Sequence, residues 1–399
     1  MNVESETMKK ILFVFALLAL ICSCATSPQS TTSSPASSAP VKPPDQPVIV
    51  DQKDSEPTFG ELLSNISVSK TSFNPSQNDT ISVSYNLSKP GKTSLRVYDA
   101  DLGLVKIIDS DGFLESGPQS FAWDGKDLDG RIVPDEAYFF IIYVEGKSGD
   151  KEVYDPTLFS GGVENDITTA QVDPQTFTIN YIMPEIGRVM IRMGIQGGPL
   201  MNQLVDWKPR VKGAITEYWD GKDKDRLINI YQNPKFKMII TYFTLPENSV
   251  ITIGNRSVDF RTYKTMVAER PQKDSPPQWR QGLSPHYPLP RTMDYSPSVS
   301  LSFSNSKGQD ENGLPVLNEK TVVKVSLDDK DKSIFQNSQF EICFYLNQDF
   351  YAEDESGYTP FNWVWDLSDV EEGEHLLTVN ISSFKDQIGV VSRKVKVVK

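Results

Sequence analysis

The chain has 399 residues, of which 38% are hydrophobic and 23% charged, and its formal net charge is −13. This length suffices for about two to three domains that each bury a core. No basic stripe is present to release counterions from a phosphate backbone, so nucleic acid is excluded as a partner.

The N-terminus carries a secretory pattern. Lys9 and Lys10 precede eleven apolar residues, 11–21. This run is too short for a membrane span, which needs about 20 residues. The next residues, Ser23 and Cys24, resemble the bacterial lipobox, in which a small residue precedes the cysteine that is cleaved and acylated. Residues 1–23 are therefore interpreted as a lipoprotein signal peptide, and an ordinary cleaved signal is the alternative.

Lipidation of Cys24 would hold the chain on a membrane through its acyl groups. The following residue is Ala25 rather than Asp. This resembles the outer-membrane sorting pattern of Gram-negative lipoproteins. The expected location is the bacterial cell envelope, lipid-anchored at the outer membrane.

A tether follows the anchor. Fourteen of the twenty residues in 25–44 are Ser, Thr or Pro, and such a composition cannot repay the entropy of ordering. Residues 24–58 are expected to form a disordered stalk. Cys343 would be the sole cysteine left in the mature chain, and its apolar surroundings predict a buried structural thiol.

An internal repeat follows the tether. Identical residues recur 96 positions apart, among them Tyr85 and Tyr181, Gly91 and Gly187, Arg96 and Arg192, Trp123 and Trp219, Asp124 and Asp220, and Phe140 and Phe236. Apolar residues alternate in both copies, as in half-buried strands. Each copy has the scale of one β-sandwich.

An acidic turn lies at the same place in both copies. It reads WDGKDLDG at 123–130 and WDGKDKD at 219–225. These residue types favour a structural turn, with a core-facing Trp, glycines that accept positive φ and aspartates that cap backbone N–H groups. The turn residues are Trp123, Asp124, Gly125, Asp127, Asp129 and Gly130, and then Trp219, Asp220, Gly221, Asp223 and Asp225.

The first copy resembles a known module. ISVSYNLSKPGKTSLRVYD and SFAWDGKDLDGRIVPDEAYFFIIYV are similar to the immunoglobulin-like domain of the flagellar hook-capping protein. The second copy departs from it, with Arg226 in place of the turn glycine. The resemblance implies tandem immunoglobulin-like sandwiches without catalytic residues, and it implies no flagellar role.

Calcium binding is the alternative reading of the acidic turn. Asp127, Asp129 and Glu136 fall at ligand positions of a calcium-loop template, but its first position is Gly125 and strands flank it. The second copy has Gln232 where the template needs the last carboxylate. A structural turn is favoured, and neither a metal nor a cofactor is expected.

The fold class is therefore all-β, with tandem sandwiches after the signal and the tether. The expected domains are 59–160, a diverged copy at 161–258, a Pro-rich connector rich in aromatics at 259–299, and a third sandwich at 300–399.

One strand of the first copy is apolar on both faces. Phe139, Ile141 and Tyr143 occupy its outer face, where the second copy has Lys235 and Lys237. Sandwich strands normally leave this face polar, so we expect a neighbouring domain or the connector to cover it. A local loop is the alternative cover.

The expected function is non-enzymatic. The chain has two histidines and no nucleophile-elbow motif. The first candidate is a lipid-anchored envelope protein that presents its domains for structural support or protein–protein interaction. The alternative is a surface carbohydrate-binding lipoprotein, in which exposed Trp207, Trp279 and Tyr287 stack on sugar rings. Packing of these rings between domains is favoured over sugar stacking. The partner is then an unknown envelope protein or a glycan.

Overall fold

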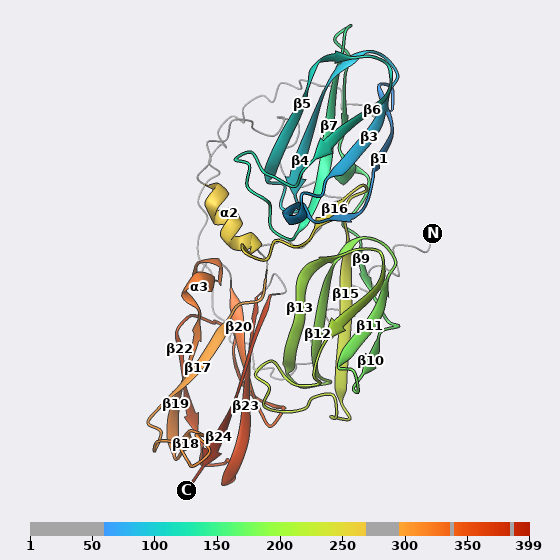
Figure 1. Ribbon diagram of the computed structural model, residues 1–399. Helices are drawn as coiled ribbons and strands as arrows, with labels where there is room; N and C mark the ends of the chain where they lie inside the picture. The colour runs from blue at the N-terminus through green and yellow to red at the C-terminus, as the bar shows by residue number, and fades with distance from the viewer. Residues whose placement is uncertain (1–59, 269–294, 336–338, 384–386) are drawn as a thin grey trace, which may run out of the picture. The chain divides into compact units, whose positions relative to one another are not determined.

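Three β-sandwiches make up the part of the chain that the computed structural model describes, namely residues 60–268, 295–335, 339–383 and 387–399. Each sandwich combines one three-stranded sheet with a larger sheet (Figure 1), and all three belong to one compact unit of the chain. The expected all-β class with tandem immunoglobulin-like sandwiches is confirmed. The signal at 1–23 and the whole tether at 24–58 lie outside the described residues. Within the described ranges, no helix is long and apolar enough to cross a membrane.

The first sandwich contains the first repeat copy. Its elements are β1 (Leu63–Val68), β2 (Ser72–Phe73), η1 (Pro75–Gln77), β3 (Ile81–Leu87), β4 (Gly91–Asp99), β5 (Leu104–Leu114), β6 (Gly117–Trp123), β7 (Ala137–Gly146), β8 (Lys151–Tyr154) and η2 (Pro156–Leu158). One sheet has the order β1-β3-β6, and β4 lies between β5 and β7 in the other. Trp123 is 1% exposed and packs edge-on against Phe73, Tyr138 and Phe140 in the core between the sheets.

The second sandwich contains the second copy. Its strands are β9 (Glu164–Asp166), β10 (Gln171–Asp173), β11 (Thr178–Met183), β12 (Gly187–Ile195), β13 (Leu200–Arg210), β14 (Gly213–Tyr218) and β15 (Phe236–Thr244). They form the sheets β10-β11-β14 and β13-β12-β15-β9. The 96-residue offset is kept in the pairing, because Thr178 pairs with Tyr218 as Ser82 pairs with Ala122.

The chain then returns to the first sandwich. Strand β16 (Val250–Thr252) pairs antiparallel with β7 and parallel with β2. Helix α2 (Phe260–Ala268) follows, and its Phe260 and Tyr263 belong to the core of the first sandwich. Residues 250–268 thus complete the first sandwich, although they were expected at the end of the second one and in the connector. The second sandwich is inserted between two parts of the first.

The third sandwich lies at the C-terminus. Its elements are β17 (Val299–Ser304), β18 (Val316–Leu317), β19 (Lys320–Leu327), α3 (Asp329–Phe335), β20 (Phe340–Leu346), β21 (Asp349–Asp354), β22 (Phe361–Asp366), β23 (Gly373–Ser383) and β24 (Ile388–Val397). Its sheets are β17-β19-β22 and β18-β24-β23-β20-β21. Trp365 is fully buried in its core, and Cys343 on β20 is also buried.

Candidate functional site

The first acidic turn is held by hydrogen bonds within its own segment. The Trp123 indole N–H donates to the Lys126 carbonyl at 2.9 Å, and Asp124 accepts from the Lys126 N–H. Asp127 is fully buried, and its Oδ1 accepts the N–H groups of Asp129 and Arg131, each at 2.9 Å. Its Oδ2 accepts the Tyr263 hydroxyl of α2 at 3.3 Å. The turn therefore anchors both its own loop and the segment that returns after the second sandwich.

The second turn repeats this arrangement. The Trp219 indole donates to the Lys222 carbonyl at 2.8 Å, and Asp220 accepts from the Lys222 N–H at 3.2 Å. Asp223 is 1% exposed and accepts the Ile228 N–H at 2.7 Å, and burial raises its pKa. The two turns thus have the same local chemistry.

One glycine position of the turn is kept in both copies, and a second one is occupied by another residue type in the second copy. Gly125 and Gly221 have φ values of +70° and +81°, so both copies use glycine there. Gly130 has a φ of +79°, and Arg226 adopts a φ of +61° at the matching place. Arg226 also forms an ion pair with Asp220 at 2.7 Å.

The carboxylates of the calcium template bind protein groups. Asp129 forms an ion pair with Arg131 at 2.7 Å, and Glu136 pairs with Arg188. No group of three or more potential metal ligands occurs in the described ranges. The structural interpretation of the turn accounts for these contacts.

The outer face of β7 is buried. Phe139 and Ile141 are 1% and 0% exposed and form a cluster with Tyr98, against which Leu102, Leu104, Tyr143 and Val153 pack. Tyr143 itself is half-buried and lies under the Arg96 guanidinium, 4.7 Å from its ring centre. All of these residues belong to the first sandwich. The described contacts show cover from within the first sandwich. Residues 269–294 of the connector, which was the other expected cover, lie outside the described residues, so cover by the connector stays a prediction.

The aromatic residues expected to stack on sugars have different outcomes. Trp207 is 7% exposed and packs edge-on against Phe243, so the expectation that its ring is available to a sugar is wrong. The cause is its position beside β12, where its carbonyl accepts two hydrogen bonds from Arg188. Trp279 and Tyr287 lie outside the described residues.

The junction of the first two sandwiches has a buried ion pair. Arg188 on β12 and Glu136, just before β7, are 2% and 1% exposed, and their charged groups are 3.4 Å apart. The Nε and Nη2 groups of Arg188 also donate to the Trp207 carbonyl at 2.9 and 2.5 Å. Burial raises the pKa of Glu136, and the neighbouring Arg188 cation opposes that rise. A buried pair of this kind specifies one arrangement of its partners more than it adds stability.

Apolar contacts continue the first junction. Ala100 and Ala137 of the first sandwich form a buried cluster with Leu245, and Ile186 and Phe243 of the second sandwich pack against it. Glu136 also donates its backbone N–H to the Thr252 hydroxyl on β16 at 3.1 Å. The junction therefore combines an apolar cluster, a buried ion pair and the sheet pairing of the returning strand.

The second and third sandwiches meet through paired polar groups. The Asn380 side chain accepts the Leu200 N–H and donates to the Leu200 carbonyl, both at 2.9 Å. The Asp225 carboxylate accepts the Ser392 N–H at 2.6 Å and pairs with Arg393 at 2.9 Å. Asp225 therefore contributes its backbone to the turn and its carboxylate to the contact with β24.

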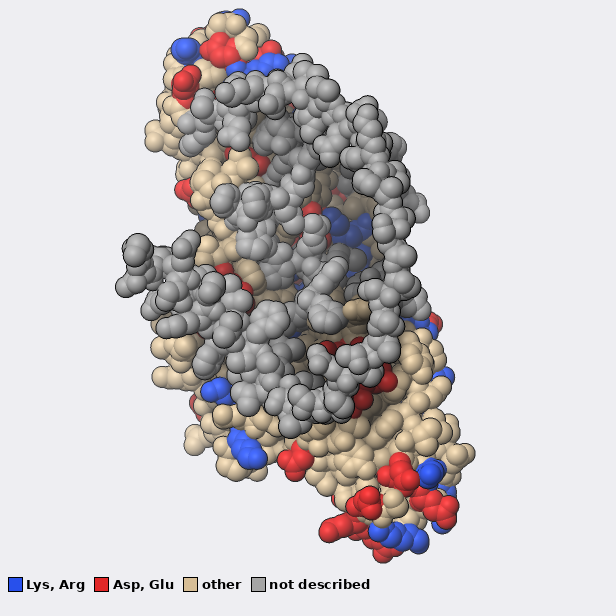
Figure 2. All heavy atoms as spheres, turned by 180° about the vertical axis from the view of Figure 1, so that it is seen from behind, with Lys and Arg blue, Asp and Glu red and all other residues tan. Residues whose placement is uncertain are grey.

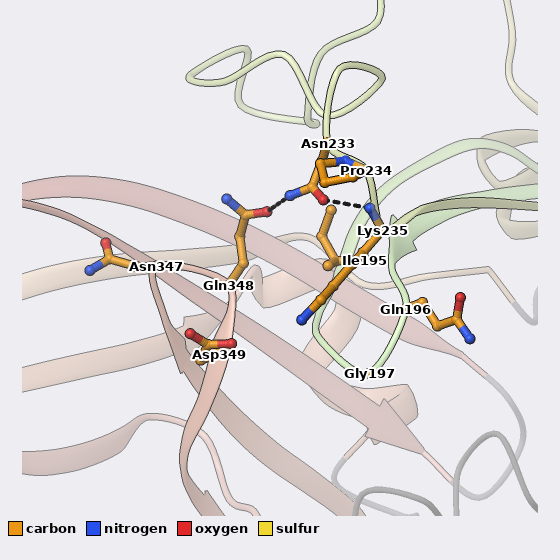
Figure 3. Close-up of a pocket in the computed structure, with 9 residues that line it drawn as sticks. All are labelled: Ile195, Gln196, Gly197, Asn233, Pro234, Lys235, Asn347, Gln348 and Asp349. Atoms are coloured by element: carbon orange, nitrogen blue, oxygen red, sulfur yellow. Dashed lines mark hydrogen bonds between the residues drawn. The ribbon is translucent and has the colours of Figure 1, made fainter.

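A cavity of about 230 Å³ lies at this second junction (Figure 3). Three turns line it, at 195–197 and 233–235 in the second sandwich and at 347–349 in the third. The Asn233 amide donates to the Gln348 side-chain oxygen at 2.6 Å across the junction. Four of the nine lining residues carry amide side chains and none is aromatic, so the cavity offers no aromatic platform.

Sequence reasoning missed the residues that build both junctions. Arg188 and Asn380 belong to ordinary amphipathic strand patterns, and only the tertiary structure gives them partners. One signal was available for Glu136, since a carboxylate beside the apolar run of β7 needs a buried cation to compensate its charge. On the face that Figure 2 shows, acidic and basic side chains of the described residues are interspersed, without a field of one sign.

Comparison with protein-family models and with curated proteins finds no match. Among solved structures, FlgD from P. aeruginosa is 29% identical, with a match that covers 23% of this chain and 66% of that chain at a TM-score of 0.19. The fibronectin(III)-like modules of CbhA from Clostridium thermocellum are 10% identical over 84% of this chain and 94% of that chain, at a TM-score of 0.19.

A structure from a 1.5-MDa bacterial ice-binding adhesin is also 10% identical, over 84% of this chain and 98% of that chain, at a TM-score of 0.18. At these TM-scores the likenesses carry no inference about function. The sheet topology described above is the ground for the assignment of tandem immunoglobulin-like sandwiches.

Proposed function

We propose that this protein is a non-enzymatic, lipid-anchored protein of the bacterial cell envelope that presents its sandwiches for structural support or protein–protein interaction. The proposed anchor is Cys24, and the proposed membrane is the outer membrane. The Lys9 to Cys24 signal pattern and the Ser/Thr/Pro-rich stretch after it support this proposal.

The observation that carries the presenting role is the construction of the two junctions. The second sandwich joins the first through two chain crossings and through the Glu136–Arg188 pair. The third sandwich contacts the second through Asn380 and Asp225. Directed hydrogen bonds and buried charges favour one arrangement of neighbouring domains, which suits a protein that holds a surface in a constant position.

The described polar clusters support a non-enzymatic role. The buried carboxylates Asp127, Asp223 and Glu136 each accept backbone hydrogen bonds or pair with a cation. His375 contacts Asn347 and the Glu371 carbonyl at 2.9 and 2.8 Å, beside a hairpin turn. In each case a structural partner accounts for a group that could otherwise serve as a base.

Membrane fractionation of a Cys24→Ala variant tests the anchor. The proposal predicts that the variant moves to the soluble fraction, because the acyl chains supply the membrane affinity. Cys343→Ala is the matched control, since Cys343 is buried in the third sandwich, and it should stay with the membrane. A Cys24→Ala protein that remains with membranes after a high-salt wash would contradict the anchor.

A further inference from the structure

The outer face of the sheet β10-β11-β14 exposes large side chains. On the two strands β11 and β14 the outward residues are Thr178, Asn180, Ile182, Ala214, Thr216 and Tyr218. The side chains of Tyr218 and Ile182 are 78% and 66% exposed.

The first copy provides an internal control for this face. The positions 96 residues earlier are Ala122 for Tyr218 and Asn86 for Ile182. The pairing is the same, since Ile182 is opposite Ala214 as Asn86 is opposite Pro118. Fold and register therefore do not require large apolar groups at these two positions. Large exposed apolar side chains on one copy alone indicate a binding role for that copy.

Hydrogen-bonding side chains lie on the same face as the exposed Tyr218 ring. The Thr216 hydroxyl donates to the Asn180 side-chain oxygen at 2.7 Å, and the Asn180 amide donates to the Thr178 hydroxyl at 3.1 Å. This row crosses from β14 to β11 on the exposed face. An amide and two hydroxyls in fixed positions can exchange hydrogen bonds with the hydroxyl groups of a ligand.

The outward residues of β11 and β14 are uncharged, although the chain has a formal net charge of −13. On the neighbouring strand β10, Asp173 lies opposite Thr178, and its carboxylate accepts the N–H groups of Gln175 and Thr176 at 2.8 and 3.3 Å. A charged partner would find no complementary charge on β11 and β14, whereas a neutral ligand needs none.

We infer that this face is a binding site for an uncharged oligosaccharide. The apolar face of a sugar ring packs on the Tyr218 ring, while sugar hydroxyls bond to Asn180 and Thr216. An aromatic ring with an adjacent row of amide and hydroxyl groups matches a ligand that has apolar ring faces and a polar rim. The site stands on the geometry of the second sandwich and is independent of the proposed lipid anchor.

Titration calorimetry of the full chain against a panel of neutral and of acidic soluble oligosaccharides tests the site. Binding of a neutral oligosaccharide is expected, and Tyr218→Ala should weaken it by about tenfold, which corresponds to the loss of one stacked ring. Tyr358→Ala removes a ring that is 56% exposed in the third sandwich and should leave the affinity unchanged. Asn180→Ala should also weaken binding, while the chain stays folded by circular dichroism.

Three outcomes would overturn the inference. The first is a panel in which no neutral oligosaccharide binds, and the second is a bound oligosaccharide whose affinity is the same for Tyr218→Ala and the wild type. The third is a protein partner, and not a glycan, that crosslinks to a photoreactive group at position 218. Membrane attachment through Cys24 is measured in a separate fractionation experiment, so failure of this site and failure of the anchor are distinguishable.

Discussion

The first and second sandwiches share a frame and differ in what they expose. In both, a Trp indole N–H donates to a Lys carbonyl, and a buried aspartate accepts a backbone N–H of the following loop. The outer face of β7 is covered, whereas Lys235 and Lys237 beside β15 are exposed. Conversely, the outer face of β11 and β14 carries the large side chains Ile182 and Tyr218, where the matching strands β3 and β6 of the first copy have Asn86 and Ala122. The comparison teaches that the turn and core are constrained by backbone geometry, while the outer faces are free to acquire contacts.

The largest expected effect falls on the junction that joins the two copies. Arg188→Met leaves the Glu136 carboxylate buried without its cation, which should lower the free energy of unfolding by about 4 kcal/mol. Glu136→Gln should cost less, because the Arg188 cation, although it stays buried, keeps its two hydrogen bonds to the Trp207 carbonyl and can donate to the glutamine oxygen. Urea unfolding followed by tryptophan fluorescence measures both variants. Equal losses for the two substitutions would mean that burial of the Glu136 charge does not dominate at this junction.

The same pair predicts a pH dependence. Burial raises the pKa of Glu136 above its usual value of 4.5, so the folded state holds this proton more tightly than the unfolded state. Its contribution to stability is then fully present below pH 4.5 and is lost as the pH rises through the raised pKa. The difference in Tm between the wild type and Glu136→Gln should therefore shift in favour of the wild type on acidification. A difference that is constant from pH 4 to 8 would rule out this titration.

The two copies differ in the space around their matching turn glycines, Gly125 and Gly221. A Cβ at Gly125 would lie 2.4 Å from the Pro75 Cβ, whereas one at Gly221 has its nearest neighbour, Asn229 Oδ1, at 3.3 Å. Gly125→Ala should therefore cost about 3 kcal/mol, from the left-handed backbone and the clash together. Gly221→Ala should cost about 1 kcal/mol from the backbone alone. Chemical denaturation compares the two, and an equal cost would mean that the loop at Pro75 gives way.

The next largest loss of stability is expected for substitution of the turn aspartates Asp127 and Asp223. Asp127→Ala removes the acceptor of two backbone N–H groups and of the Tyr263 hydroxyl, for an expected loss of about 2 kcal/mol. Asp223→Ala should cost somewhat less, because no hydroxyl from a distant helix bonds to it among the described contacts. Tyr263→Phe should lower the stability of the wild type but not that of Asp127→Ala. Additive losses in this double-mutant cycle would mean that the two groups are not coupled.

The smallest effect concerns the position where the copies differ in residue type. Gly130→Arg should cost about 1 kcal/mol, since a side chain in the left-handed region is strained but no neighbouring atom lies within 4 Å of the added Cβ. Arg226→Gly should change stability by less than about 0.5 kcal/mol, because the relief of strain is offset by the greater freedom of glycine in the unfolded chain. Thermal unfolding of both variants checks this order, and a larger loss for Arg226→Gly would contradict it.

Much of the frame could be predicted from the sequence. The alternating residues of 81–87 and the Trp-Asp-Gly turns report local backbone requirements, which is why the sandwiches and the turn positions agree with expectation. The insertion could not be predicted, because β16 has only three residues and its partners β2 and β7 are more than a hundred residues away. The same holds for Trp207, whose burial depends on β12 and Phe243 rather than on its own strand pattern.

Hydrogen exchange on the full chain tests most directly the central claim that the first sandwich is completed only after the second has been inserted. The N–H groups of Ile251 and Thr252 donate to Thr71 and Glu136 of the first sandwich at 2.9 and 3.0 Å. They should therefore exchange as slowly as the N–H groups of β7 and require the same cooperative opening. Exchange at Ile251 and Thr252 that is as fast as in the neighbouring loop at 254–259, while β7 stays protected, would contradict the insertion.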